Sequence, residues 1–445
     1  MQNHPRRKPG GQSDLAKLLK AAPVSDRAEK ARMRPHRSAR LVGGMITAKI
    51  CAMAGSAAFA STLVELARAW HLDSTRAGWI SSAYLIGYAL AVPILVSLTD
   101  RIDPRAIFLA GCAIGTVAFA GFALLARGVA SAFLFQAMAG VSLAGIYMPG
   151  LRVLTQRLEL RARIRAVPYY TGAFGIGTGL SFLISGWLSA RYGWQATFAA
   201  GAAGTTLSAI LMIWSAWGIS IASDFDAAPS NRHPLDFRPV LRNRGTLPYI
   251  FAYGGHSWEL FAFRAWLPTF LLFAWNHSAM TDAGFAISRW STLIVLIGVP
   301  SSIVGAELAT RWTRNRLIRW FEIASIAAGL LAPACGGFSF GLAVLAMFAY
   351  NAAITADSGA LTASVVAITR PGEQGATLAV YSMIGFGGGA IGPLAVGAML
   401  DLGGGFDVAH AWYLGFAAMV VGSALAAVAI TLASASSEAW RTGAS

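Results

Sequence analysis

The sequence predicts an all-α integral membrane protein with twelve transmembrane helices arranged as two similar bundles of six. Three observations lead to this fold class. Apolar residues make up 56% of the chain and charged residues only 12%, about half the charge of a soluble domain. The apolar residues gather into stretches of about 20 residues, the length that a helix needs to cross a bilayer. The two halves of the chain also repeat each other.

The twelve predicted spans follow one another with short polar connections. We expect helices rather than strands, because a strand exposed to lipid leaves backbone groups without hydrogen-bond partners. The spans cover residues 43–66, 77–98, 106–126, 130–152, 167–189, 194–217, 247–275, 289–311, 317–335, 338–365, 376–400 and 410–434.

The internal repeat has two pairs of anchors. Residues 96–101 read Val-Ser-Leu-Thr-Asp-Arg, and residues 306–311 read Ala-Glu-Leu-Ala-Thr-Arg, at an offset of 210. A second pair of anchors, at an offset of 211, consists of Gly177, Gly186, Gly388 and Gly397. Duplication in a hydrophobic chain favours a transporter, because alternating access needs two similar bodies that rock around one site.

The basic residues predict the orientation in the membrane. If both termini are cytoplasmic, the inner segments hold 28 of the 35 Lys and Arg and the outer loops hold five. Positive residues collect on the cytoplasmic side of membrane proteins. We therefore predict a multi-pass protein of the cell inner membrane with cytoplasmic termini. The same asymmetry accounts for the net charge of +15 and disfavours a nucleic-acid partner.

The sequence divides into five predicted segments. Residues 1–42 form a basic tail, which we expect to be disordered because it is polar and poor in aromatic residues. It is either a passive topogenic tail or an anchor to anionic lipid, and it lacks the apolar core of a signal peptide. Residues 43–217 and 247–434 form the two bundles, residues 218–246 a cytoplasmic linker, and residues 435–445 a short tail.

Six spans, a linker and six more spans resemble the major facilitator superfamily (MFS), and the loop after span two carries part of the resemblance. It is similar to the family motif Gly-x-x-x-Asp-Arg-x-Gly-x-Arg-Arg, of which it keeps Asp100, Arg101 and Arg105. The second copy keeps Arg311 but has Thr310 in place of the aspartate. The resemblance covers about residues 40–435 and implies a secondary active transporter that works by alternating access.

Glycine-rich motifs extend the resemblance. Residues 193–198 are similar to the family pattern Gly-Trp-Arg-x-x-Phe, and span eleven carries a Gly-Pro pair in a glycine run. Small residues let membrane helices approach closely. We therefore predict that six residues of spans five and eleven allow helices to pack closely. They are Gly177, Gly186, Gly388, Gly392, Pro393 and Gly397.

Charged residues at the predicted inner face are candidates for gating. Asp100 can pair with Arg101, with Arg105 or with a basic group on a neighbouring helix, and such a latch would hold one conformation. The alternative is a solvated loop charge. Arg152 and Arg311 complete the gating candidates.

Span seven holds the densest group of ionisable residues. A charge inside a span is costly, so it usually faces a cavity or a partner. His256 and Glu259 are one helical turn apart and can pair, whereas Arg264 points elsewhere. Glu259 is our first candidate for a proton-carrying group, with a structural role in helix packing as the alternative. Trp258 joins His256 and Arg264 as a substrate-binding candidate.

The repeat adds a prediction about depth. An offset of 210 places Lys49 of span one opposite Glu259 of span seven. We expect Lys49 to face the cavity, with snorkelling to the inner surface as the alternative.

Polar residues in other spans complete the candidate site. Asp357 could bind a coupling proton or pair with Arg152 as a latch. Glu322 and Glu307, near the inner ends of their spans, are expected to be latch or interface charges. Further substrate-binding candidates are Tyr84, Tyr88, Tyr147 and Asn351.

The predicted function is secondary active transport of a small solute, expected to be coupled to protons. The alternative is a non-transporting receptor or assembly factor on the same scaffold. A membrane enzyme is disfavoured, because no nucleophile–base constellation occurs and the seven His are scattered, which predicts neither a metal site nor a cofactor. Arg264, His256, Lys49 and Arg152 could form an anion site, and uptake and export both remain open. We expect a monomer surrounded by membrane lipid.

Overall fold

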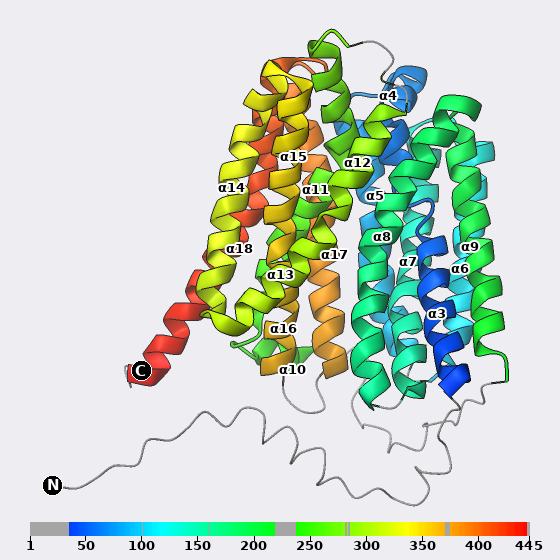
Figure 1. The fold of residues 1–445 in the computed structure, drawn as a ribbon, viewed down its shortest axis with the longest axis vertical. Coiled ribbons are helices and arrows are strands. Elements are labelled where there is room, and N and C mark those ends of the chain that lie inside the picture. The colour runs from blue at the N-terminus through cyan, green and yellow to red at the C-terminus, as the bar shows by residue number, and fades with distance from the viewer. Residues whose placement is uncertain are drawn as a thin grey trace, which may run out of the picture.

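The computed structural model describes residues 35–99, 101–158, 160–218, 237–280, 283, 285–369 and 374–442. These residues form two bundles of helices that stand side by side (Figure 1). The predicted fold class, an all-α membrane protein of two six-span bundles, is confirmed. We call the side on which the first described helix begins and the last one ends the terminal face, and the other side the distal face.

The N-terminal bundle is coloured blue to green in Figure 1. Its helices are α3 (Pro35–Ala52), α4 (Ala58–Trp70), α5 (Ser74–Leu98), α6 (Pro104–Leu125), α7 (Val129–Arg157), α8 (Leu160–Tyr192) and α9 (Trp194–Ala216).

The C-terminal bundle follows a short helix, α10 (Arg238–Arg242). Its helices are α11 (Leu247–His277), α12 (Ala286–Leu296), α13 (Gly298–Arg311), α14 (Arg314–Phe338), α15 (Phe340–Ala356), α16 (Ser358–Ile368), α17 (Gln374–Leu402) and α18 (Ala409–Thr442).

Among the described residues, ten helical runs are long and apolar enough to cross a membrane, with α12–α13 and α15–α16 each counted as one run. The other two predicted spans are α3–α4, which is interrupted, and α11, which carries Glu259 and Arg264. Each predicted span therefore corresponds to a helix or to a pair of helices in line.

Both ends of the described chain are more helical than predicted. Residues 35–42 were assigned to the disordered tail, yet α3 already begins at Pro35. Two hydrogen bonds to the end of α9 hold the first turns of α3. Arg40 donates to the Trp217 carbonyl at 2.5 Å, and Arg37 donates to the Gly218 carbonyl at 3.3 Å. Helix α18 likewise continues to Thr442. Residues 1–34 and 219–236, most of the predicted tail and linker, lie outside the described residues.

The first span is interrupted between α3 and α4, and Ser181 of α8 repairs the break. Its hydroxyl donates to the Ala54 carbonyl at 2.7 Å and accepts a hydrogen bond from the Ala57 amide at 2.9 Å. Backbone groups inside a membrane must find partners within the protein. One side chain thus supplies partners for both ends of the break.

The five glycines predicted to pack helices all lie where a neighbouring helix leaves no room for a Cβ atom. A Cβ on Gly397 would lie 2.2 Å from the Ser74 carbonyl oxygen, and one on Gly186 would overlap Ser288, so both glycines lie between the bundles. Within the bundles, Gly388 and Gly392 of α17 face the backbone of α11, and Gly177 faces Met53. Close approach therefore occurs both inside each bundle and between the two.

Asp401, near the end of α17, links the two bundles at the distal face. Its carboxylate accepts hydrogen bonds from the Ser74 and Thr75 amides, each at 2.8 Å, at the start of α5. The exposed amides of a helix N-terminus favour a negative group. This contact joins the two bundles on the side away from the termini.

Candidate functional site: a central cavity and a buried acidic cluster

A cavity of about 70 Å³ lies between the two bundles. The α3–α4 break, α4, α5, α7 and α8 contribute its N-terminal wall, and α11 and α17 its C-terminal wall. Five aromatic residues line it: Phe59, Tyr84, Phe174, Phe182 and Phe261. Its polar lining consists of Ser56, Ser81, Gln136, Thr178 and Arg264. The cavity is therefore mostly apolar and holds few polar groups, as small-molecule sites usually do.

Arg264 is the charged residue of this lining. Its guanidinium carbon lies 5.6 Å from the ring centre of Phe174 and 5.9 Å from that of Phe261. Its Nε and Nη1 atoms are buried and have no hydrogen-bond partner among the described residues. Buried donors without partners are costly, and no acceptor among the described residues offsets this cost at Arg264.

Lys49 lies behind the cavity wall, inside the N-terminal bundle. The side chain is fully buried, and its Nζ donates to the Tyr170 carbonyl at 2.8 Å. The same atom lies 3.8 Å from the ring centre of Tyr147 and 4.3 Å from that of Tyr170. Lys49 is not among the residues that line the cavity. The aromatic rings thus form a cage that stabilises a buried cation.

Phe174 connects the two buried cations. The Lys49 Nζ atom lies 5.8 Å from the centre of its ring, and the Arg264 guanidinium carbon lies 5.6 Å from the same centre. Phe174 also lines the cavity. A ligand that stacks on this ring would therefore lie close to positive charge from both bundles.

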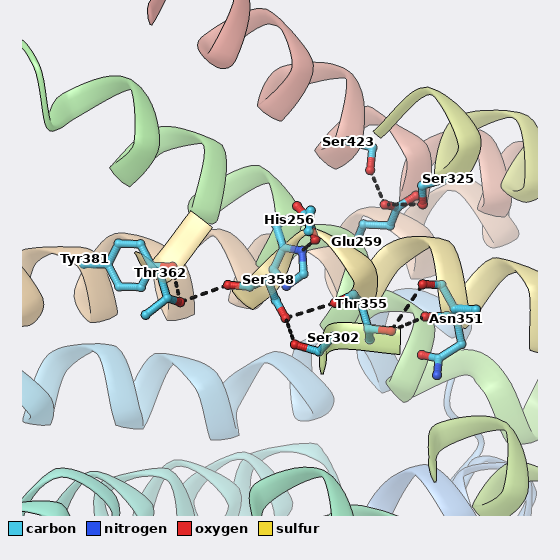
Figure 2. Close-up of polar contacts among 12 residues, drawn as sticks. His256, Glu259, Ser302, Ser325, Asn351, Thr355, Ser358, Thr362, Tyr381 and Ser423 are labelled. Atoms are coloured by element: carbon cyan, nitrogen blue, oxygen red, sulfur yellow. Dashed lines mark hydrogen bonds and ion pairs between the residues drawn. The ribbon is translucent and has the colours of Figure 1, made fainter. Parts of the chain in front are cut away.

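A second group of polar residues lies within the C-terminal bundle (Figure 2). His256 of α11 places Nδ1 2.8 Å from Oδ1 of Asp357, which lies between α15 and α16. Both side chains are at most 3% exposed. The predicted pairing of His256 with Glu259 is therefore replaced by a pairing with Asp357, because Glu259 takes its partners from three other helices.

Glu259 is fully buried and receives three hydroxyl groups. Tyr350 of α15 donates to one carboxyl oxygen at 2.7 Å, and Ser325 of α14 donates to the other at 2.9 Å. Ser423 of α18 donates to that second oxygen as well, as Figure 2 shows. Four helices of the bundle thus meet at this carboxyl group.

Glu322 of α14 is the acidic residue whose environment the sequence did not predict. Expected to be a latch or interface charge near the inner end of its span, it is 2% exposed and lies near enough to Asp357 to interact with its carboxyl group. The hydrophobic boundaries of a span do not reveal on which side of the helix a residue lies. Three carboxyl groups therefore share the interior of one bundle.

The structure does not bring Lys49 and Glu259 together across the cavity. Lys49 contacts aromatic residues of its own bundle, and Glu259 contacts hydroxyl groups of the other bundle. Neither lines the cavity. The repeat relates the depth of two residues but not the direction of their side chains about the helix axis.

The substrate-binding candidates separate into two groups. Arg264 and Tyr84 line the cavity, and the others do not. Trp258 donates to the Ala418 carbonyl at 3.0 Å, and Asn351 to that of Ile294 at 2.7 Å. Tyr88 stacks on Phe386 with ring centres 3.7 Å apart.

Tyr147 faces Lys49, and His256 faces Asp357. These side chains hold helices in position around the cavity rather than forming its surface.

The gating candidates have local contacts. Arg105 lies 3.1 Å from the Asp103 carboxylate, and Arg152 donates to Thr99 Oγ1 at 2.6 Å. Arg311 pairs with Glu307 at 3.1 Å on the same helix.

Asp100 lies outside the described residues, and Arg101 is exposed. The pairing of Arg152 with Asp357 that we considered is not formed, because the two side chains have Thr99 and His256 as neighbours.

Sequence reasoning missed most of the cavity wall. Gln136 offered a usable signal, because it is a lone amide within an apolar span. Phe174 and Phe261 offered none, since they are two of 24 Phe in a hydrophobic chain.

Comparison with known proteins relates this architecture to membrane transporters. The family model described as Major Facilitator Superfamily matches residues 45–356. A gallate transporter of Pseudomonas putida is 25% identical over 387 residues, which cover 77% of this chain and 81% of that protein. A 3-(3-hydroxy-phenyl)propionate transporter of Escherichia coli (strain K12) is 27% identical over 359 residues, or 75% of this chain and 84% of that protein.

A solved structure supports the same fold. A bacterial homolog to the human lysosomal transporter Spinster, in an inward-facing and unoccupied conformation, superimposes with a TM-score of 0.73 at 15% identity. The match covers 91% of this chain and 98% of that one.

Proposed function

The chain belongs to the Major Facilitator Superfamily, and from this premise we propose that it carries an aromatic carboxylate across the membrane by alternating access. The family and the relatives make it a multi-pass transporter of a small solute and not an enzyme. The proposal concerns the substrate, its coupling to protons and the orientation of the chain.

The observation that carries the proposal is the buried guanidinium of Arg264 in an aromatic cavity. Its Nε and Nη1 lack partners among the described residues, and an arginine fork matches the two oxygens of a carboxylate. The rings of Phe174 and Phe261 lie beside it and can stack on the ring of a substrate. The two named relatives, for gallate and for 3-(3-hydroxy-phenyl)propionate, transport aromatic acids, which supports this chemistry.

The test is uptake of radiolabelled benzoate, 4-hydroxybenzoate and 3-phenylpropionate into proteoliposomes, compared with the corresponding neutral amides. We expect the acids to be transported and the amides to be rejected. Arg264→Gln should weaken binding of the acids about ten- to hundredfold, the range for a charge-assisted hydrogen bond. Arg316→Gln, at an exposed arginine of α14, should have no effect.

Two results would contradict the proposal. One is that no aromatic acid is transported or bound. The other is that Arg264→Gln and Arg316→Gln bind the acids equally well. Binding without any flux would favour the alternative, a receptor on a transporter scaffold.

Coupling to protons is the second part of the proposal. The C-terminal bundle buries Glu259 and Asp357 with His256, and buried ionisable groups in membrane proteins commonly belong to ion or proton pathways. We expect a proton gradient to drive accumulation of the acid, and a protonophore to abolish that accumulation while leaving exchange intact. Accumulation that persists with the protonophore would refute coupling.

Orientation completes the proposal. The concentration of Lys and Arg in segments on one side of the spans supports cytoplasmic termini in the inner membrane. The terminal face then lies on the cytoplasmic side, and the distal face, where Asp401 meets α5, on the outer side. A protease site appended to the C-terminus should be cleaved only from the cytoplasmic side.

A further inference from the structure

Three carboxyl groups are buried in the C-terminal bundle, but hydrogen-bond donors are distributed unequally among them. Glu259, Glu322 and Asp357 are each at most 2% exposed. No Lys or Arg lies within ion-pair distance of any of the three among the described residues. Buried carboxylates without a cation need hydrogen bonds or a proton to remain in an apolar interior. Each of the three satisfies this need differently.

The carboxylate of Glu259 is stabilised by hydrogen bonds and does not require protonation to remain buried. Hydroxyl groups of Tyr350, Ser325 and Ser423 donate to its two oxygens. Three hydroxyl donors from three helices can stabilise the charge of the carboxylate and hold the group in place. This arrangement ties α11 to α14, α15 and α18.

Asp357 and Glu322 have the opposite arrangement. Glu322 Oε1 and Asp357 Oδ2 are buried and accept no hydrogen bond from the described residues. Asp357 Oδ1 has a single neighbouring donor, His256, and Glu322 shares the Ser423 hydroxyl with Glu259. The side chains of Glu322 and Asp357 lie close enough to interact electrostatically, and two neighbouring carboxylates repel unless one of them carries a proton. His256 Nδ1, 2.8 Å from Asp357 Oδ1, is the neighbouring nitrogen.

We propose that Asp357 and Glu322 hold the transported proton between them, and that Glu259 is a fixed anchor and not the proton carrier. This inference rests on the proposed coupling to protons and assigns it to particular residues. In the loaded pair, one carboxyl has an O–H bond and donates to the other carboxylate. Release breaks that bond, delivers one proton to water and leaves two carboxylates in contact.

The location of the pair explains how the proton changes the conformation. Asp357 lies at the break between α15 and α16, where its side chain caps neither helix. Loss of the proton would drive Asp357 of the break away from Glu322 of α14. His256 then transmits the movement to α11, the helix that carries Arg264 two turns further on. The titratable groups around the pair come from α11, α15 and α17: Tyr253, His256, Glu259, Arg264, Tyr350 and Tyr381.

The proposal predicts a separation between two modes of transport. Glu322→Gln and Asp357→Asn should keep exchange of substrate across the membrane, which moves no net proton. Both should lose at least about tenfold in accumulation driven by a proton gradient. Asp407→Asn, at an exposed acid between α17 and α18 of the same bundle, is the matched control and should retain both modes. Accumulation at the wild-type level in both Glu322→Gln and Asp357→Asn would overturn the proposal.

A spectroscopic test does not depend on transport. Purified wild-type protein should show the infrared band of a protonated buried carboxyl group. The band should disappear in both Glu322→Gln and Asp357→Asn and persist in Glu259→Gln and Asp407→Asn. A band that is lost only in Glu259→Gln would refute the assignment. If wild-type protein shows the band but no proton-driven flux, the proposed coupling fails while the shared proton stands.

Discussion

Asp401 of the C-terminal bundle accepts two hydrogen bonds from Thr75 of the N-terminal bundle, at 2.8 Å from its amide and 2.5 Å from its Oγ1. The first amides of α5 would otherwise lack partners. The carboxylate of one bundle therefore completes a helix start of the other, and this is possible only while the distal face is closed. Asp73 caps the same helix from within its own bundle, through the Arg76 amide at 2.7 Å.

We predict that Asp401→Asn shifts the protein toward a state that is open at the distal face, because the charge that stabilises the closed contact is lost. The accessibility of Ser81, which lines the cavity on α5, reports this shift after its replacement by a single cysteine. In the Asp401→Asn variant this cysteine should react several-fold faster than in the parent protein with a membrane-impermeant maleimide added at the distal face, as expected for a loss of about 1 kcal/mol. The three native cysteines are replaced by alanine for this measurement. Asp73→Asn is the matched control, and equal rates in the two variants would contradict the latch.

The cage around Lys49 predicts an energetic coupling between Lys49 and Tyr147. The Nζ atom is 3.8 Å from the Tyr147 ring centre, and a desolvated cation–π contact contributes about 2 kcal/mol. Tyr147→Leu should therefore lower the free energy of unfolding by about 2 kcal/mol more in wild type than in a Lys49→Met background. Tyr192→Leu, at an exposed ring, should show no such coupling, and additive effects for Tyr147 would refute the cage.

Two adjacent glycines of α17 should respond differently to the same substitution. A Cβ on Gly388 would lie 2.2 Å from the Gly254 carbonyl oxygen of α11, whereas one on Gly387 meets nothing within 4 Å. Gly388→Ala should lower the melting temperature by several degrees, because the two helices must separate, at a cost of about 1–3 kcal/mol. Gly387→Ala should leave it unchanged or raise it slightly, since alanine favours helix. Equal melting temperatures would show that α11 moves without cost.

Phe174 should control the size and the affinity of substrates. Its ring lines the cavity and contacts both Lys49 and Arg264. Phe174→Ala should weaken binding of single-ring acids about tenfold, because a stacked ring contributes about 1 kcal/mol beyond its buried area. It should also admit a two-ring acid such as 2-naphthoate. Phe338→Ala, at a ring that is 82% exposed, is the control; unchanged selectivity in Phe174→Ala would place the substrate elsewhere.

Hydropathy and the internal repeat were sufficient to predict the fold. A stretch of apolar residues must become a helix inside a membrane, so the number of spans and their division into two bundles follow from the sequence. The interruption at residues 53–57 could not be predicted, because its Gly55-Ser56 pair weakens a helix but a similar pair, Gly422-Ser423, lies inside the unbroken α18. Backbone turns satisfy part of the break, and Ser181, 124 residues away from Ala57, supplies the partners for the Ala57 amide and the Ala54 carbonyl.

The candidate site could be predicted only in part. Arg264 was identified because a charge within a span is rare, and it does line the cavity. The partners of His256 and Glu259 could not be found from helical spacing, since they come from other helices. The direction of the Lys49 side chain could not be predicted either. A change of one residue in the repeat offset turns a side chain by about 100° about the helix axis.

The interruption of the first span has an evolutionary consequence. Ser56 and Ala57, which line the cavity, belong to the segment between α3 and α4, where main-chain groups are not committed to a regular helix. A substrate contact made by a peptide group does not depend on the identity of a side chain, so most point mutations leave it unchanged. Natural variation in substrate preference within this lineage should therefore accumulate on the opposite wall, at Phe261, while Arg264 and the first span change little.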